Sequence, residues 1–197
     1  QMRDDGVTRA ACFLTSAYSS YSGCRQYREN LAAAAAAVTG APRLDRLRAY
    51  FNHPGFLEAN VSAARDGVDA LATELRADAH LVFVTHSIPI AMNETSGPSG
   101  GAYLTQHRAV VEMIVRTIAE RTGRTHEHSL VFCSRSGAPH VPWLEPDIND
   151  ELEQLAAGGT KALGVVPIGV VADHTQLIYD LDTEAKAAAT PAPAAAA

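Results

Sequence analysis

The sequence has few of the residues that mark specialised protein classes, and each scarcity narrows what the chain can be. Its 197 residues include only three cysteines, an odd number with no Cys-x-x-Cys pair, so a disulfide framework is not indicated. The uninterrupted apolar runs, such as 31–38 and 81–84, are far shorter than the roughly 20 residues that span a bilayer. We therefore expect a cytoplasmic protein in a reducing compartment.

Positive charge is also scarce. A formal net charge of -6 and the lack of a basic run argue against nucleic acid as a partner, because phosphate backbones attract clustered Lys and Arg. With 47% hydrophobic and 19% charged residues, the chain has the composition of an ordinary globular protein. These properties favour a small-molecule partner, and we expect a monomer.

Short apolar runs alternate with longer helical patterns along the chain. The runs predict strands at 7–14, 43–50, 79–84, 129–133 and 162–166. The patterns between them predict helices at 25–38, 55–76, 103–121, 147–157 and 174–186. This alternation is typical of an α/β fold with parallel sheet, in which ligands bind beyond the carboxyl ends of the strands. The first places to search are therefore the polar loops at 16–22, 85–87, 134–137 and 172–174.

The last predicted helix carries oxygen-bearing side chains at a regular spacing. Gln176, Asp180 and Glu184 are four residues apart, so on a helix turning about 100° per residue they stay within about 80° of one another. A row of oxygen ligands on one helical face suits a hard divalent cation. A solvated polar face is the alternative interpretation, and Asp173 with Gln176 also has the spacing of a helix-capping pair.

Several loop motifs occur in a fixed order along the chain. They are Ser16-Ala-Tyr-Ser-Ser-Tyr-Ser-Gly-Cys-Arg-Gln-Tyr-Arg-Glu-Asn30, Phe51-Asn-His-Pro-Gly-Phe56, Thr85-His-Ser-Ile-Pro89, Cys133-Ser-Arg-Ser-Gly137, Pro142-Trp-Leu-Glu-Pro-Asp147, Pro167-Ile-Gly169 and Asp173-His-x-x-x-x-Tyr-Asp180. Together they resemble the ferrochelatase family, especially its actinobacterial members, over about residues 1–186. The third and the last motif in combination are the most specific part of the resemblance.

The resemblance implies an enzyme, a lyase of haem and porphyrin biosynthesis that inserts ferrous iron into a porphyrin, in actinobacteria coproporphyrin III. It implies Rossmann-like parallel sheets in two similar domains that enclose the porphyrin, and no cofactor beyond the iron that is itself a substrate. Family members are longer, so the resemblance also implies a fragment. Residues 1–40 would be a remnant of the first domain, 41–186 the second domain with the metal site, and 187–197 a disordered Ala/Pro tail.

The resemblance assigns the metal chemistry to His86, Gln176, Asp180 and Glu184. His86 would face the metal and receive pyrrole protons, because histidine exchanges protons near neutral pH. Gln176, the other catalytic position, stands where the family has glutamate, and an amide offers a carbonyl oxygen but neither charge nor useful basicity. A catalytically weak or inactive porphyrin- or haem-binding homologue is therefore the alternative function, and a chelatase for another metal is a third.

The loop at 16–22 interleaves tyrosines with serines, a composition suited to the carboxylate tails and flat ring of a porphyrin. Tyr18, Ser19, Ser20 and the nearby Tyr27 are the candidates for substrate binding, although a plain serine-rich connector would look the same. By resemblance Trp143 lies beside the porphyrin, whereas a lone tryptophan is otherwise more often a core residue.

Cys24 raises the question of an iron–sulfur cluster. Some bacterial ferrochelatases hold a two-iron two-sulfur cluster with one internal cysteine in a similar context and three near the C-terminus. Such clusters use four thiolates as a rule, and the C-terminal three have no counterpart here. Cys12 and Cys133 fall in predicted buried strands, where cysteine behaves as a small apolar residue. We expect no cluster in this chain, and Cys24 would be a ligand only in a full-length protein.

Overall fold

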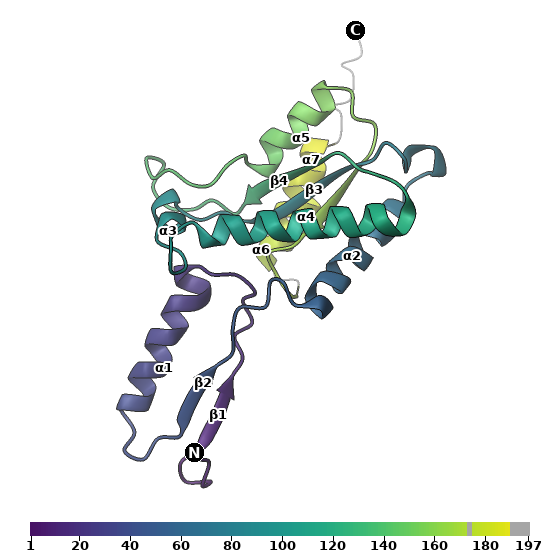
Figure 1. The fold of residues 1–197 in the computed structure, drawn as a ribbon. Helices are drawn as coiled ribbons and strands as arrows, with labels where there is room; N and C mark the ends of the chain where they lie inside the picture. The colour runs from purple at the N-terminus through teal and green to yellow at the C-terminus, as the bar shows by residue number, and fades with distance from the viewer. Residues whose placement is uncertain (173–174, 190–197) are drawn as a thin grey trace.

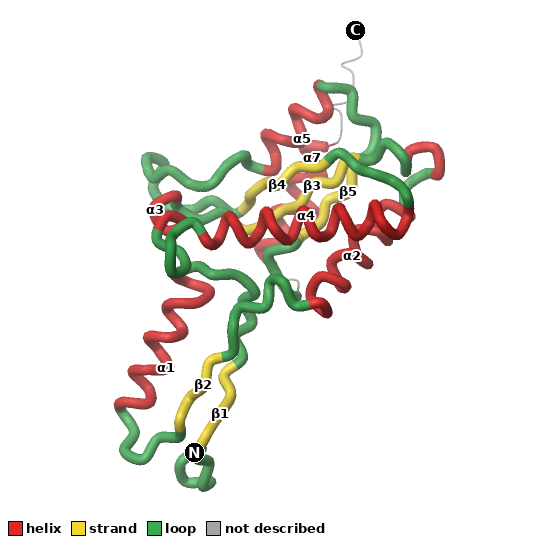
Figure 2. The backbone as a smooth tube through the Cα atoms, viewed as in Figure 1, coloured by secondary structure: helices red, strands yellow, loops and turns green. Residues whose placement is uncertain are grey.

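Two parallel sheets form two lobes of different size, shown in Figures 1 and 2. The computed structural model describes residues 1–172 and 175–189. In the small lobe, β1 (Arg9–Cys12) pairs in parallel with β2 (Arg43–Arg46), and the π-helical turn η1 (Tyr21–Arg25) and α1 (Gln26–Ala36) connect them. This lobe projects away from the rest of the molecule in Figure 1.

The main lobe is built on a three-stranded parallel sheet with the order β4-β3-β5. Its strands are β3 (His80–His86), β4 (His128–Cys133) and β5 (Leu163–Pro167). The central strand is apolar on both faces, as expected for a parallel sheet covered by helices, and residues 81–84 are at most 1% exposed. Since the strands are parallel, their carboxyl ends meet at one edge, where His86 lies opposite Cys133.

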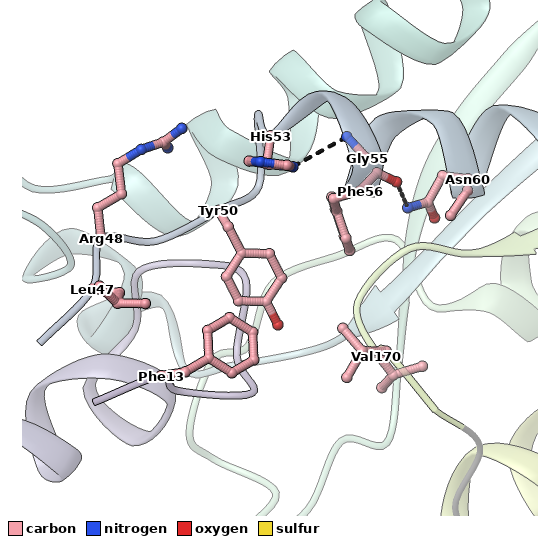
Figure 3. A pocket seen from close by; sticks show the side chains of 11 residues that line it. Phe13, Leu47, Arg48, Tyr50, His53, Gly55, Phe56, Asn60 and Val170 are labelled. Carbon is pink, nitrogen blue, oxygen red and sulfur yellow. Dashed lines mark hydrogen bonds between the residues drawn. The ribbon is translucent and has the colours of Figure 1, made fainter. Parts of the chain in front are cut away.

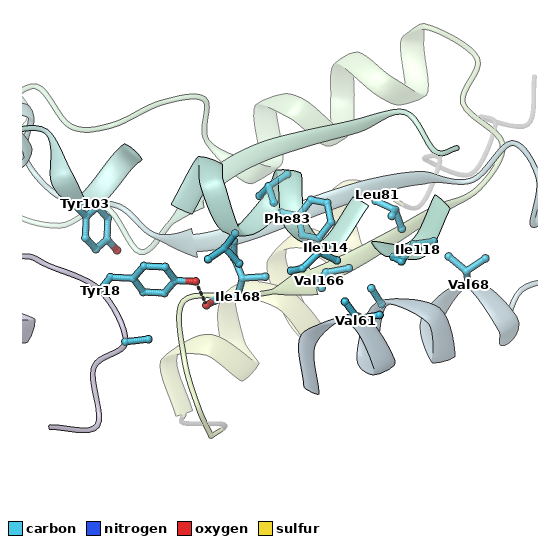
Figure 4. Close-up of a cluster of buried hydrophobic side chains, with 14 of the residues drawn as sticks. Tyr18, Val61, Val68, Leu81, Phe83, Tyr103, Ile114, Ile118, Val166 and Ile168 are labelled. Atoms are coloured by element: carbon cyan, nitrogen blue, oxygen red, sulfur yellow. Dashed lines mark hydrogen bonds between the residues drawn. The ribbon is translucent and has the colours of Figure 1, made fainter. Parts of the chain in front are cut away.

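Helices cover both faces of the main sheet. On one face, α2 (Pro54–Asp69) and α4 (Ala102–Thr122) pack against the strands through a cluster that includes Val61, Phe83 and Ile114, drawn in Figure 4. On the other face lie α5 (Ile148–Ala157) and the C-terminal helix, whose Ala185 packs against Val84 and its neighbours. The shorter elements are the 3-10 turn η2 (Thr73–Leu75) and α3 (Ile90–Glu94).

The C-terminal helix changes its winding along its length. It begins as α6 (Thr175–Ile178), widens into the π-helical segment η3 (Tyr179–Ala185) and ends as α7 (Lys186–Ala189). π-Helical stretches are rare in proteins, and those that occur often lie at functional sites. In the described residues no helix combines the length and apolar character needed to cross a membrane.

The α/β fold class and the parallel sheets are confirmed, and each of the five expected strands is present. The strand expected at 43–50 is shorter and ends at Arg46, because its partner β1 ends at Cys12 opposite that residue. The helix expected at 55–76 ends at Asp69, and α3 and η1 were missed.

The predicted domain limits stay a prediction, although two features of the fold bear on them. The β2 strand, which begins after residue 40, pairs with β1 and so extends the small lobe past that limit. Residues 187–189, assigned to the tail, form the last turn of a helix, whereas 190–197 lie outside the described residues.

Candidate functional site

His86 is the last residue of β3, and it is exposed although the five residues before it are buried. Side chains alternate along a strand, so His86 belongs to the same sheet face as Val82 and Val84. Both valines pack in the cluster that contains Ala185 of η3. The imidazole therefore belongs to the face that the C-terminal helix covers, at the edge where ligands bind in parallel sheets.

A small cavity lies at this edge of the sheet. Its volume is about 20 Å³, which is about the room that one water molecule needs. Residues from all three strand ends and from the C-terminal helix line it: Val84, Thr85, His86, Cys133, Ser134, Pro167, Gly169, Val170 and Leu177. Burial raises the pKa of the Cys133 thiol to about 11, so Cys133 is a neutral wall of the cavity at physiological pH.

The three oxygen-bearing residues of the C-terminal helix have different surroundings. Asp180 is buried, and Ser134, which follows β4, donates a hydrogen bond to its carboxylate. Gln176 and Glu184 are exposed. The helix therefore places a carboxylate inside the protein beside the strand ends, with an exposed oxygen-bearing side chain on either side of it.

Ser134 is a residue whose role the sequence did not indicate by itself. It lies in the loop at 134–137, one of the polar loops that follow strands. The sequence could not indicate its contact with Asp180, because Asp180 is 46 positions further along the chain. Within the ranges 1–172 and 175–189, no three His, Cys, Asp or Glu side chains gather as a metal-holding group. The metal assignments of His86, Gln176, Asp180 and Glu184 stay a prediction, and the motif residues Asp173 and His174 lie outside the described residues.

The serine and tyrosine candidates of the loop at 16–22 make different contacts within the protein. Tyr18 is 2% exposed, donates a hydrogen bond to the Ile168 carbonyl at 2.9 Å and stacks on His107. Burial raises its pKa well above the usual tyrosine range. Ser19 exchanges two hydrogen bonds with Gln106, and Ser20 caps η1 by accepting from the Gly23 N–H. These contacts give the residues structural roles, and their assignment to substrate stays a prediction.

Ser19 and Ser20 also line a cavity of about 610 Å³ between the small lobe and the loop that follows α3. Arg25, Arg28 and Arg46 contribute to its wall, together with Glu29, which pairs with Arg25. Sequence reasoning missed these arginines, because two of them were read only as part of a motif and the third as part of a strand.

The two remaining aromatic candidates lie elsewhere. Tyr27 is on the exposed surface of α1. Trp143 forms a β-bridge with Pro89, just past the strand end that carries His86. Its indole Nε1 is buried and has no hydrogen-bond partner among the described residues.

The cysteines do not come together as a ligand set. Cys24 lines the arginine-rich cavity, where its Sγ accepts a hydrogen bond from Arg46 Nη1 at 3.0 Å. Cys12 ends β1 in the small lobe, and Cys133 is buried in β4 of the main lobe. The chain has three cysteines where a two-iron two-sulfur cluster uses four, so its own thiols do not fit that group.

A larger, mostly apolar cavity of about 730 Å³ was not expected from the sequence (Figure 3). Phe13 and Tyr50 stack with their ring centroids 5.1 Å apart, and Phe56 packs edge-on against Tyr50. Val170, which follows β5, lines both this cavity and the small cavity that His86 lines. The two cavities therefore adjoin the same strand end.

Comparison with known proteins identifies the family. The family model described as ferrochelatase matches residues 1–196. A coproporphyrin III ferrochelatase of Streptomyces coelicolor is 51% identical over 198 residues, which are 96% of this chain and 53% of that protein. Proteins of the same name from Frankia alni and Mycobacterium marinum are 52% and 49% identical and are covered over 48% and 52% of their lengths. The chain thus spans about half the length of the curated relatives it matches.

Proposed function

The chain belongs to the ferrochelatase family, and we propose that it serves the insertion of ferrous iron into coproporphyrin III. The observation that carries this proposal is the position of His86. His86 ends the central strand and lines the cavity of about 20 Å³. It lies on the sheet face covered by the helix that holds Asp180. A base and a carboxylate at one strand edge could serve metal insertion, because the base can accept pyrrole protons and the carboxylate can bind a cation.

The proposed chemistry begins with proton removal. Two pyrrole N–H protons must leave the porphyrin before iron can bind its four nitrogens. His86 is the residue that receives them, one at a time, and it passes the first to solvent before it accepts the second, since imidazole exchanges protons near neutral pH. Bending of the macrocycle, driven by binding energy, would turn the pyrrole nitrogens toward the metal. Iron would approach along Glu184, Asp180 and Gln176, where carboxylate and amide oxygens replace part of its water shell.

The carboxylate tails of the porphyrin need cationic or hydroxyl partners. Ser19 and Ser20 are our candidates, and the arginines of the cavity that they line support this role, because guanidinium groups pair strongly with carboxylates. Tyr27 and Trp143 are the proposed aromatic contacts. Tyr18 would act mainly by holding the loop, since its ring and hydroxyl are engaged in the core.

The test of this proposal is zinc insertion into coproporphyrin III by the purified chain, followed by the fluorescence of the zinc porphyrin. We expect His86→Ala to lower the rate by at least about a hundredfold, the usual contribution of a general base. His140→Ala, which removes an exposed histidine from the loop after β4, is the matched control and should leave the rate unchanged. Equal rates for the two variants would contradict the role of His86.

Gln176 decides between the enzyme and a binding protein. We expect Gln176→Glu to raise the insertion rate by about tenfold, because a carboxylate can neutralise the entering cation. Gln154→Glu on the exposed surface of α5 adds the same charge elsewhere and should have no effect. Equal rapid rates with Gln and Glu at 176 would show that the amide suffices. Porphyrin binding without insertion by either protein would favour the weak or inactive binding homologue.

A further inference from the structure

A set of buried polar groups lies behind His86, on the opposite face of the main sheet. Thr85 is 2% exposed, Tyr103 7% and His107 0%. Thr85 precedes His86 on β3, whereas the other two come from neighbouring turns of α4. Nothing in the motifs of the chain points to these two α4 residues. Buried polar groups are nearly always hydrogen-bonded, so each of these three side chains is expected to have a partner.

The hydrogen bonds connect these groups in a definite order. His107 Nδ1 lies 2.8 Å from the Tyr103 carbonyl oxygen, and His107 Nε2 lies 2.9 Å from Thr85 Oγ1. A carbonyl oxygen can only accept, so Nδ1 carries the proton and Nε2 accepts from the Thr85 hydroxyl. The Tyr103 hydroxyl donates its proton to the His86 carbonyl oxygen at 2.8 Å. The set thus ends on the backbone of His86 itself.

Burial keeps each group in the protonation state that these bonds need. Desolvation lowers the pKa of His107 to about 4, so the ring stays neutral with one donor and one acceptor nitrogen. Desolvation also raises the pKa of Tyr103 to about 12, so its phenol keeps the proton that it donates. Both groups are therefore fixed donors or acceptors across the physiological pH range.

Tight packing leaves the set little room to rearrange. The Tyr18 ring stacks on His107 with the ring centroids 3.5 Å apart. Gly169, just past β5, approaches Thr85 so closely that a Cβ added there would lie 3.1 Å from the Thr85 Cα and still nearer its hydroxyl. Figure 4 shows Tyr18 and Tyr103 together at one end of the core, away from Val68 at the other end.

We propose that Thr85, Tyr103 and His107 are positioning residues that fix the backbone at His86 and so aim its imidazole at the metal. This inference rests on the proposed function, because it concerns the same histidine. Consecutive side chains of a strand point to opposite faces, so anchoring Thr85 on the α4 face fixes the direction of His86 on the other. Partners that orient a ligand or base are commonly worth about 10- to 100-fold in metal affinity or activity.

The test measures zinc binding to the intact chain by calorimetry. Loss of zinc affinity in His86→Ala first establishes how much of the binding depends on the imidazole. We expect Tyr103→Phe and Thr85→Val to weaken this His86-dependent binding by about tenfold, because each removes one hydroxyl of the set. Thr117→Val, which removes a hydroxyl that donates to the Met113 carbonyl of its own helix, is the matched control and should bind zinc as the unchanged chain does.

A conservative variant separates positioning from simple packing. Thr85→Ser keeps the hydroxyl and loses the methyl group, whereas Thr85→Val keeps the volume and loses the hydroxyl. Positioning predicts that serine restores zinc affinity and valine does not, whatever their thermal midpoints. If valine binds zinc normally while His86→Ala does not, the positioning role is overturned. If His86→Ala itself binds zinc normally, the proposed metal role of His86 fails instead.

Discussion

The two lobes share a β-α-β pattern but differ in what holds them together. In the main lobe, β3 is buried on both faces and the helices on either side contribute Ile, Leu and Val to the core. In the small lobe, the described residues of β1, α1 and β2 include none that is buried. An alternating pattern therefore specifies secondary structure, whereas a core also needs large side chains on facing surfaces.

The small lobe lacks those side chains for a reason visible in α1. The helix is rich in alanine, which favours helix formation but offers little apolar area to bury. Charged contacts take a larger share there: Arg9 and Arg43 both pair with Asp45 across and along the two strands. Such exposed pairs contribute little, and a two-stranded sheet is marginal by itself.

The largest expected effect compares one leucine from each lobe. Leu81→Ala in β3 should lower the free energy of unfolding by about 2–5 kcal/mol, because the side chain is fully buried and its removal leaves a cavity. Leu44→Ala in β2 should cost about 1 kcal/mol or less, since this position is only partly buried. Urea unfolding followed by circular dichroism measures both. Equal losses would show that the small lobe contributes to the same core.

The next effect concerns pH and depends on the main lobe alone. His107 has its pKa lowered to about 4 by burial, below the value near 6.5 expected in the unfolded chain. Between these values the unfolded chain binds a proton at His107 that the folded chain does not. His107 therefore causes no loss in the free energy of unfolding above pH 6.5, and the loss grows as the pH drops toward 4. The loss should reach about 3 kcal/mol.

Unfolding midpoints of the chain and of His107→Gln between pH 4 and 7.5 measure this effect. The variant should be less stable at neutral pH and should lose most of the pH slope in that window. His126→Gln is the matched control, because His126 is also buried with Nδ1 bonded to a backbone carbonyl. An unchanged slope in His107→Gln would show that other groups govern the acid sensitivity.

Some of this architecture was visible in the sequence and some was not. The presence of the five strands was predicted correctly, because apolar patterning is a local property, whereas the loop predicted at 172–174 lies partly outside the described residues. The burial of Tyr18 and Asp180 was not predicted, because it depends on Ile168, His107 and Ser134, which are far away in the chain. His107 itself had a usable signal, since it falls on the apolar face of α4 together with Val110, Val111 and Ile114.

A third effect tests the close packing near the site. Gly169→Ala should destabilise the main lobe by about 1–3 kcal/mol, because the new methyl group would collide with Thr85. Gly67→Ala in α2 is the matched control, since no atom of the described residues lies within 4 Å of a Cβ at that position. It should stabilise by about 0.5–1 kcal/mol through better helix propensity. Opposite signs in thermal unfolding would confirm that the contact, and not the loss of a glycine, is responsible.

The smallest effect should be confined to the small lobe. The hydrogen bond from Arg9, together with one from Arg43, holds the pKa of Asp45 below its usual range. The contribution of Asp45 to stability is therefore present above the unfolded pKa near 3.9 and is lost as the pH falls through the lowered value. Asp45→Asn should speed amide exchange in β1 and β2 at neutral pH and leave the main-lobe unfolding midpoint unchanged. The two partners of Asp45 are exposed, and no residue in the described part of the main lobe pairs with it. Faster exchange in β3 as well would mean that the two lobes open as one unit, and the contrast between a core-bound lobe and a charge-bound lobe would then fail.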